Sequence, residues 1–119
     1  MRPKLFSICA ASALLANAAF AAPPEIIELA RANVELFSEL EECAAHSDFQ
    51  VYGLSRSGPC GDWVDRIEAQ QRLDSQLAGQ GLANCLAGDI RLAGISLVSG
   101  DPMHFDFVSE LVEDCREEL

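Results

Sequence analysis

The chain has 119 residues, half of them hydrophobic, and it carries 19 acidic residues against eight basic ones. Its formal charge of −11 argues against binding to nucleic acid or to an anionic membrane, because attraction between basic side chains and phosphate groups supplies much of such affinity. The same charge would attract a basic protein partner. The alternative is that the acids only keep the protein soluble.

A cleavable signal peptide is predicted at the N-terminus. Residues 1–4 contain two basic side chains, Leu5–Leu15 is an apolar run, and Ala19–Ala21 has the small residues that precede a cleavage site. The apolar run is shorter than the ~20 residues that cross a bilayer, so no retained membrane anchor is expected. We therefore predict cleavage after Ala21, with Ala22 as the alternative, and a single periplasmic domain at residues 22–119.

The predicted mature chain is short and more acidic than its precursor. Removing 21 of the 119 residues leaves 98, a length that suits one small domain. Two of the eight basic residues, Arg2 and Lys4, leave with the leader, so six remain against 19 acids and the formal charge becomes −13.

Four cysteines remain in the predicted mature chain: Cys43, Cys60, Cys85 and Cys115. An even number in a short exported chain predicts a disulfide framework, because the periplasm is oxidising. No two of them have the C-x-x-C spacing of zinc ribbons or thioredoxin-type redox sites. Of the three pairings that four cysteines allow, we favour Cys43–Cys60 and Cys85–Cys115, which would join neighbouring helices. Each bond would stabilise the domain by roughly 3 kcal/mol.

The first predicted helix begins at Pro23-Pro24-Glu25, where proline and an acid are favoured, and runs to about Ala45. Apolar residues recur at steps of three and four, with most glutamates on the opposite, solvated side. The residues of its buried side are Ile26, Leu29, Ala30, Asn33, Leu36, Phe37, Leu40, Cys43 and Ala44.

A loop and a second helix are expected next. Residues 47–59 contain glycines, a proline and several serines, and are predicted to be a loop. A helix is predicted to begin at Pro59-Cys60-Gly61-Asp62 and to end at Gly79-Gln80-Gly81. Its buried side is marked by Trp63, Val64, Ile67, Leu73 and Leu77, and Gln70 and Gln71 make that side narrow in the middle.

Two further helices complete the expected fold. Asp89 is predicted to cap a short third helix that includes Ile90 to Val98, although Ile95–Val98 would also suit a strand. Asp101-Pro102 combines a capping residue with a proline at the first helical position of the last helix. The apolar stripe of that helix is Phe105, Val108, Leu111, Val112 and Cys115. The predicted fold class is all-α: a small four-helix domain cross-linked by two disulfides.

The sequence offers little for catalysis. Its two histidines, His46 and His104, lie at a predicted helix end and in a first turn, outside any metal-ligand spacing. Its serines show no G-x-S-x-G nucleophile motif. The acids of the last helix, such as Glu110 and Glu113, lack the alternating ligands of a calcium loop and are expected to be solvated. No enzymatic activity, metal or cofactor is therefore predicted.

A binding function is what remains. Phe49, Tyr52, Leu54 and Arg56, in the predicted loop, have the aromatic and arginine character of interface anchors, so they are the predicted partner-binding residues. The apolar residues among them, with Val51, are expected chiefly to fill the core, and a contact patch is the alternative. The partner is predicted to be a basic protein, and a homodimer is also compatible with the sequence.

The cysteine pattern resembles that of the small periplasmic immunity proteins that protect type VI-secreting bacteria from their own peptidoglycan amidase effectors. The matching segments are Glu42-Cys43, Cys60-Gly61-Asp62-Trp63-Val64, Cys85-Leu86-Ala87-Gly88-Asp89-Ile90 and Cys115. Asp62 stands where the family would have a glycine, and the third helix is shorter. The resemblance implies an exported helical protein that binds and inhibits a cell-wall amidase.

Two other functions fit the same composition. The chain could be a periplasmic acid-stress chaperone, because its 19 acids would lose their charge at low pH and apolar surface would then become exposed. It could also be a structural subunit of an envelope complex.

Both disulfides are expected to form completely in the exported protein. Non-reducing peptide mapping of that protein should find Cys43, Cys60, Cys85 and Cys115 in disulfide-linked peptides and detect no free thiol. A free Cys43 or Cys115 would contradict the prediction of a domain cross-linked by two disulfides.

Overall fold

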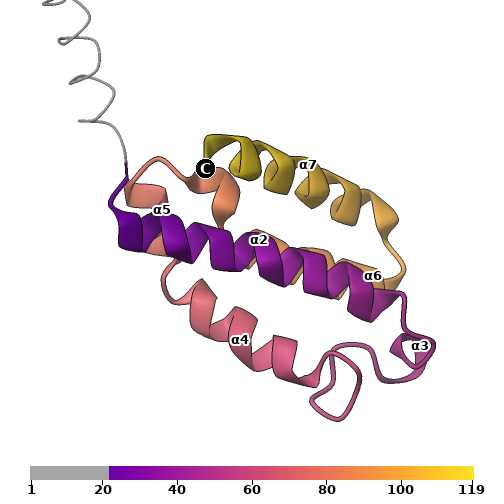
Figure 1. Cartoon of the computed structure of the whole chain (residues 1–119). Coiled ribbons are helices and arrows are strands. Elements are labelled where there is room, and N and C mark those ends of the chain that lie inside the picture. Colours follow the sequence, from indigo (N-terminus) through magenta and orange to yellow (C-terminus); the bar gives the residue numbers. More distant parts are fainter. Residues whose placement is uncertain (1–21) are drawn as a thin grey trace, which may run out of the picture.

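The computed structural model describes residues 22–119, whose regular elements are all helices, with no strand among them (Figure 1). The predicted signal peptide, residues 1–21, lies outside the described residues. In chain order the elements are α2 (Pro24–Ala44), α3 (Phe49–Tyr52), α4 (Gly61–Gln71), α5 (Asp74–Gly79), the 3-10 helix η1 (Ala83–Cys85), α6 (Ala87–Ser99) and α7 (Pro102–Glu118). The all-α prediction is confirmed, and residues 87–99 form a helix instead of a strand.

α2 is the helix on which the others pack. α3, α4, α5, η1, α6 and α7 all contact it (Figure 1). It begins with Pro24 at the first helical position and Glu25 in the first turn, as predicted. Its buried side consists of Ile26, Ala30, Asn33, Leu36, Phe37 and Leu40.

The core consists of two apolar clusters that follow each other along α2. One surrounds Phe37 and Leu40 and includes Trp63 of α4 and Val108 of α7. The buried residues of the other are Ile26, Ala30, Leu77, Leu82, Cys85 and Cys115. The completely buried Asn33 lies on α2 between the two sets of residues.

The predicted second helix is divided in two. α4 ends at Gln71 and α5 begins at Asp74. The break allows Leu77 of α5 to enter the cluster around Ile26. It also places the Asp74 carboxylate at the start of α6, where it accepts hydrogen bonds from the amide of Ala87 (2.8 Å) and the amide of Gly88 (2.8 Å).

The prediction that Asp89 caps the third helix is wrong. α6 begins at Ala87, with Leu86 as the residue before it, so Asp89 is its third residue. The free amides of the first turn are satisfied by Asp74, which is distant in sequence, and a capping rule based on local sequence does not detect such a contact. At the last helix the local rule holds, since the Asp101 side chain accepts a hydrogen bond from the amide of Met103 (3.2 Å).

Both predicted disulfides are present. Cys43–Cys60 joins the end of α2 to the start of α4, with Cα atoms 5.8 Å apart, and Cys85–Cys115 joins η1 to α7, with Cα atoms 5.2 Å apart. Such bonds indicate an oxidising, extracytoplasmic compartment.

Among residues 22–119, no helix has both the length and the apolar character needed to cross a bilayer.

Loss of the Asp74 carboxylate should destabilise the domain. We expect Asp74→Ala to lower the free energy of unfolding by roughly 1–2 kcal/mol, because two amides of α6 lose their acceptor. The control is Ser75→Ala, at an exposed neighbouring position, which should change stability by less than about 0.5 kcal/mol. Urea unfolding followed by the fluorescence of Trp63, the single tryptophan, measures both variants. Equal stabilities would contradict the assigned cap.

Candidate functional site

The four predicted partner-binding residues lie in different environments. Phe49 is only 3% exposed and belongs to the core, whereas Tyr52, at the end of the short helix α3, is 50% exposed. Leu54 is partly buried against the core. Arg56 is at the surface, where its guanidinium contacts the Asp65 carboxylate at 2.9 Å. Of the four residues, Tyr52 and Arg56 are therefore the most accessible to a partner.

Arg56 is already engaged by acids of α4. It donates from Nε to Asp65 Oδ1 at 3.0 Å, and a second contact reaches Glu68 at 3.9 Å. The hydrogen bond to Asp65, followed by the charges of Asp65 and Glu68, raises the pKa of Arg56 above its ordinary value. This exposed network fixes the loop between α3 and α4 but leaves no free positive charge at Arg56.

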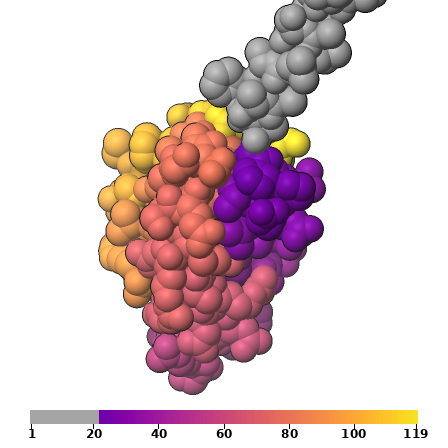
Figure 2. Space-filling view, turned by 90° about the vertical axis from the view of Figure 1, so that its left-hand side faces the viewer, coloured from indigo at the N-terminus to yellow at the C-terminus, as the bar shows by residue number. Residues whose placement is uncertain are grey.

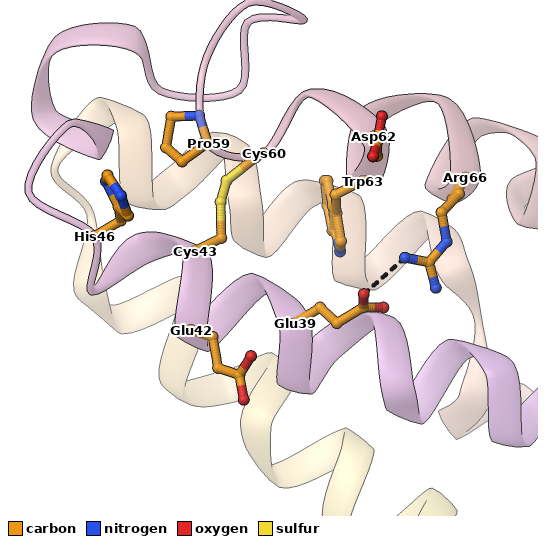
Figure 3. Close-up of a pocket in the computed structure, with 9 residues that line it drawn as sticks. All are labelled: Glu39, Glu42, Cys43, His46, Pro59, Cys60, Asp62, Trp63 and Arg66. Carbon is orange, nitrogen blue, oxygen red and sulfur yellow. Dashed lines mark hydrogen bonds and ion pairs between the residues drawn. A yellow bond between two sulfur atoms is a disulfide. The ribbon is translucent and has the colours of Figure 1, made fainter.

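A polar pocket of about 320 Å³ lies beside the Cys43–Cys60 disulfide (Figure 3). The end of α2 and the start of α4 supply its walls, which the disulfide holds together. Its lining residues are Glu39, Glu42, Cys43, His46, Pro59, Cys60, Asp62, Trp63 and Arg66. Glu39, Glu42 and Cys43 lie on one face of α2, and Asp62, Trp63 and Arg66 lie on one face of α4.

The pocket contains more acid than base. Arg66 donates to Glu39 Oε1 at 2.7 Å, and this hydrogen bond raises the pKa of the arginine (Figure 3). The second oxygen of Glu39 is buried and has no hydrogen-bond partner among the described residues. Glu42 and Asp62 also line the pocket, and within residues 22–119 no basic side chain forms an ion pair with either. A positively charged side chain is the group that this lining favours.

The groups in the pocket suit recognition better than catalysis. His46 accepts a hydrogen bond at Nδ1 from the amide of Asp48 (3.1 Å), so its other ring nitrogen is the one that can donate. Trp63 lines the pocket, and its indole Nε1 donates a buried hydrogen bond to the carbonyl of Leu36 (2.7 Å). No hydroxyl nucleophile lines this pocket, and both its cysteines are in a disulfide.

The remaining candidate groups lie elsewhere. His104 is partly buried near the start of α7, and its Nε2 has no hydrogen-bond partner in the described part of the chain. Burial raises the pKa of Asp89, helped by the nearby charge of Asp74, while His104 acts in the opposite direction. No cluster of three or more metal-ligating side chains occurs within residues 22–119.

In comparisons with known proteins, no protein-family model, curated protein or solved structure matches the chain.

The pocket is not predictable from local sequence because its two walls are distant in the chain. The helical pattern predicts Glu39 and Glu42 on a solvated face, Asp62 at a helix start and His46 at a helix end. The favoured pairing of Cys43 with Cys60 could have indicated the pocket, because that disulfide brings the end of α2 next to the start of α4.

Proposed function

We propose that residues 22–119 form a periplasmic binding protein that recognises a single basic protein, and that this partner is a cell-wall amidase which it inhibits. The chain would act without catalysis of its own and without a cofactor. The observation that carries the proposal is the acidic outer face of α2, which ends at the polar pocket of Figure 3.

The charge distribution along α2 supports a basic partner. Five exposed glutamates lie on this helix: Glu25, Glu28, Glu35, Glu41 and Glu42. Arg31 is its single basic residue. Carboxylates concentrated on one side of a small protein accelerate the encounter with a positively charged surface and suppress encounters with acidic ones.

The rigidity of the scaffold supports a binding role as well. Cys43–Cys60 fixes the pocket walls and Cys85–Cys115 fixes the opposite half of the domain. A surface that is already ordered loses little conformational entropy when it binds, which favours tight and specific complexes. The choice of an amidase as partner rests on the resemblance of the cysteine pattern to that of the amidase immunity proteins.

An affinity purification tests this proposal. Residues 22–119 are used as bait in periplasmic extract at neutral pH, and recovered proteins are assayed for peptidoglycan hydrolysis with and without added bait. We expect one basic hydrolase, inhibited at equimolar bait.

Two matched variants test the acidic face of α2 in the same experiment. Glu28→Gln/Glu35→Gln/Glu42→Gln should slow association with the hydrolase by about tenfold at low salt. Asp114→Asn/Glu117→Gln/Glu118→Gln removes the same charge from the end of α7 and should have a smaller effect. Recovery of many unrelated proteins only after acidification would contradict the proposal and support a chaperone. A stable partner without hydrolase activity would support a structural subunit.

A further inference from the structure

The large hydrophobic side chains that remain exposed within residues 22–119 are confined to three elements. We call them the apolar face: Val51 and Tyr52 of α3, Leu92, Ile95 and Val98 of α6, and Met103 and Phe107 of α7, each 45–79% exposed. None lies on α2, whose outer surface carries the glutamates. The start of α2, in indigo, and the orange α6–α7 region lie at opposite edges of the molecule in Figure 2.

Beyond Arg91, α6 carries apolar side chains on both its buried and its exposed side. One side buries Ala87, Ile90 and Ala93, while Leu92 and Ile95 are about half exposed on the opposite side. From Leu92 to Gly100 no residue is charged. A helix that is apolar on all sides is normally buried on all sides. The exposed side of α6 therefore has the character of a surface that another molecule covers.

α7 extends this surface on one flank of α6. The two helices are joined by the short connection Gly100-Asp101 and pack extensively along each other. His104 lies in the first turn of α7, directly after this connection. The rings of His104 and Phe107 have centroids 6.1 Å apart, which places Phe107 on the same side. Met103 lies one turn before it.

α3 extends the surface on the other flank. Val51, Tyr52 and Val98 line one shallow hollow of about 110 Å³ between α3 and the end of α6. The backbone of Gly53 approaches α6 so closely that a Cβ atom there would lie 3.2 Å from a methyl carbon of Val98. Gly53 also has a φ of 55°, which favours glycine. α3 and the end of α6 thus form one apolar surface.

The size of the apolar face is sufficient for a specific interface. Seven large side chains, each 45–79% exposed, present apolar surface on the order of several hundred Å². The largest apolar patch on a typical monomer measures about 300–600 Å², and a specific interface buries about 800 Å² on each partner. This face can therefore form the apolar centre of such an interface.

The charges around the apolar face select its partner. From Leu92 to Cys115 the chain contains five acids and neither lysine nor arginine. The basic residue that precedes this stretch, Arg91, is engaged with Glu68 at 3.6 Å and with Gln71 at 3.1 Å. A second copy of the chain would bring acids against acids at the rim, whereas lysines or arginines of another protein would meet opposite charge.

We propose that the apolar face is the docking surface for an apolar segment of a partner protein, flanked by lysine or arginine residues. The inference rests on the proposed function, because it specifies how the basic partner is held. The net negative charge of the chain attracts the partner from a distance, and the apolar face supplies the desolvated contacts that determine how long it stays bound.

A defined peptide tests this inference without knowledge of the natural partner. The probe is a short synthetic helix of lysine and leucine in amphipathic order, titrated calorimetrically into residues 22–119 at neutral pH and physiological salt. We expect Ile95→Asn to raise the Kd of this peptide by about tenfold, because an exposed apolar anchor is lost. The matched control Ala69→Asn, at an exposed position of α4, should leave the Kd unchanged. A peptide with glutamate in place of lysine should not bind.

Three results would overturn the inference. The first is no binding of the lysine-leucine peptide, and the second is equal binding by Ile95→Asn and the wild type. In either case the recovery of an inhibited basic hydrolase would still stand as support for the proposed function. The third is a concentration-dependent dimer, measured by sedimentation equilibrium, that Ile95→Asn abolishes, because the apolar face would then belong to a second copy.

Discussion

A buried amide on α2 holds the two halves of this small domain in register. The Asn33 side chain donates from Nδ2 to the carbonyl of Cys85 at 2.7 Å and accepts at Oδ1 from Gln70 Nε2 at 2.9 Å. Gln70 also donates to the carbonyl of Leu29 at 3.2 Å. The penalty for an unpaired polar group in this fully buried position makes any other arrangement of α2, α4 and η1 costly.

The two faces of the molecule follow from this arrangement. Each apolar cluster contains one disulfide and uses the same side of α2, so the opposite side of that helix is left to the glutamates. α6 packs beyond α2 and exposes its outer side, where Leu92 and Ile95 have no covering element in residues 22–119. The glutamates of α2 and the apolar face thus lie on different helices of the domain.

Rules based on local sequence correctly predicted the features of this fold that depend on neighbouring residues. Periodicity placed α2 and α7, Asp101 is the cap that its sequence indicates, and the spacing of the cysteines favoured the pairing that is present. What failed depends on contacts between distant residues. Asp74 caps α6 from the start of α5, and Gln70 interrupts an apolar stripe because its partner is Asn33. The pocket and the apolar face are also formed by residues of separate elements, and local patterns do not predict which of these residues come together.

The most direct test of this account is a double-mutant cycle on Asn33 and Gln70. The free energies of unfolding of Asn33→Ala, Gln70→Ala and the double variant are measured by urea titration, with both disulfides intact. We expect the two substitutions to be coupled by about 1–2 kcal/mol, because the first one already removes the hydrogen bond that the second would remove. Additive effects would show that the amide pair does not hold the helices together.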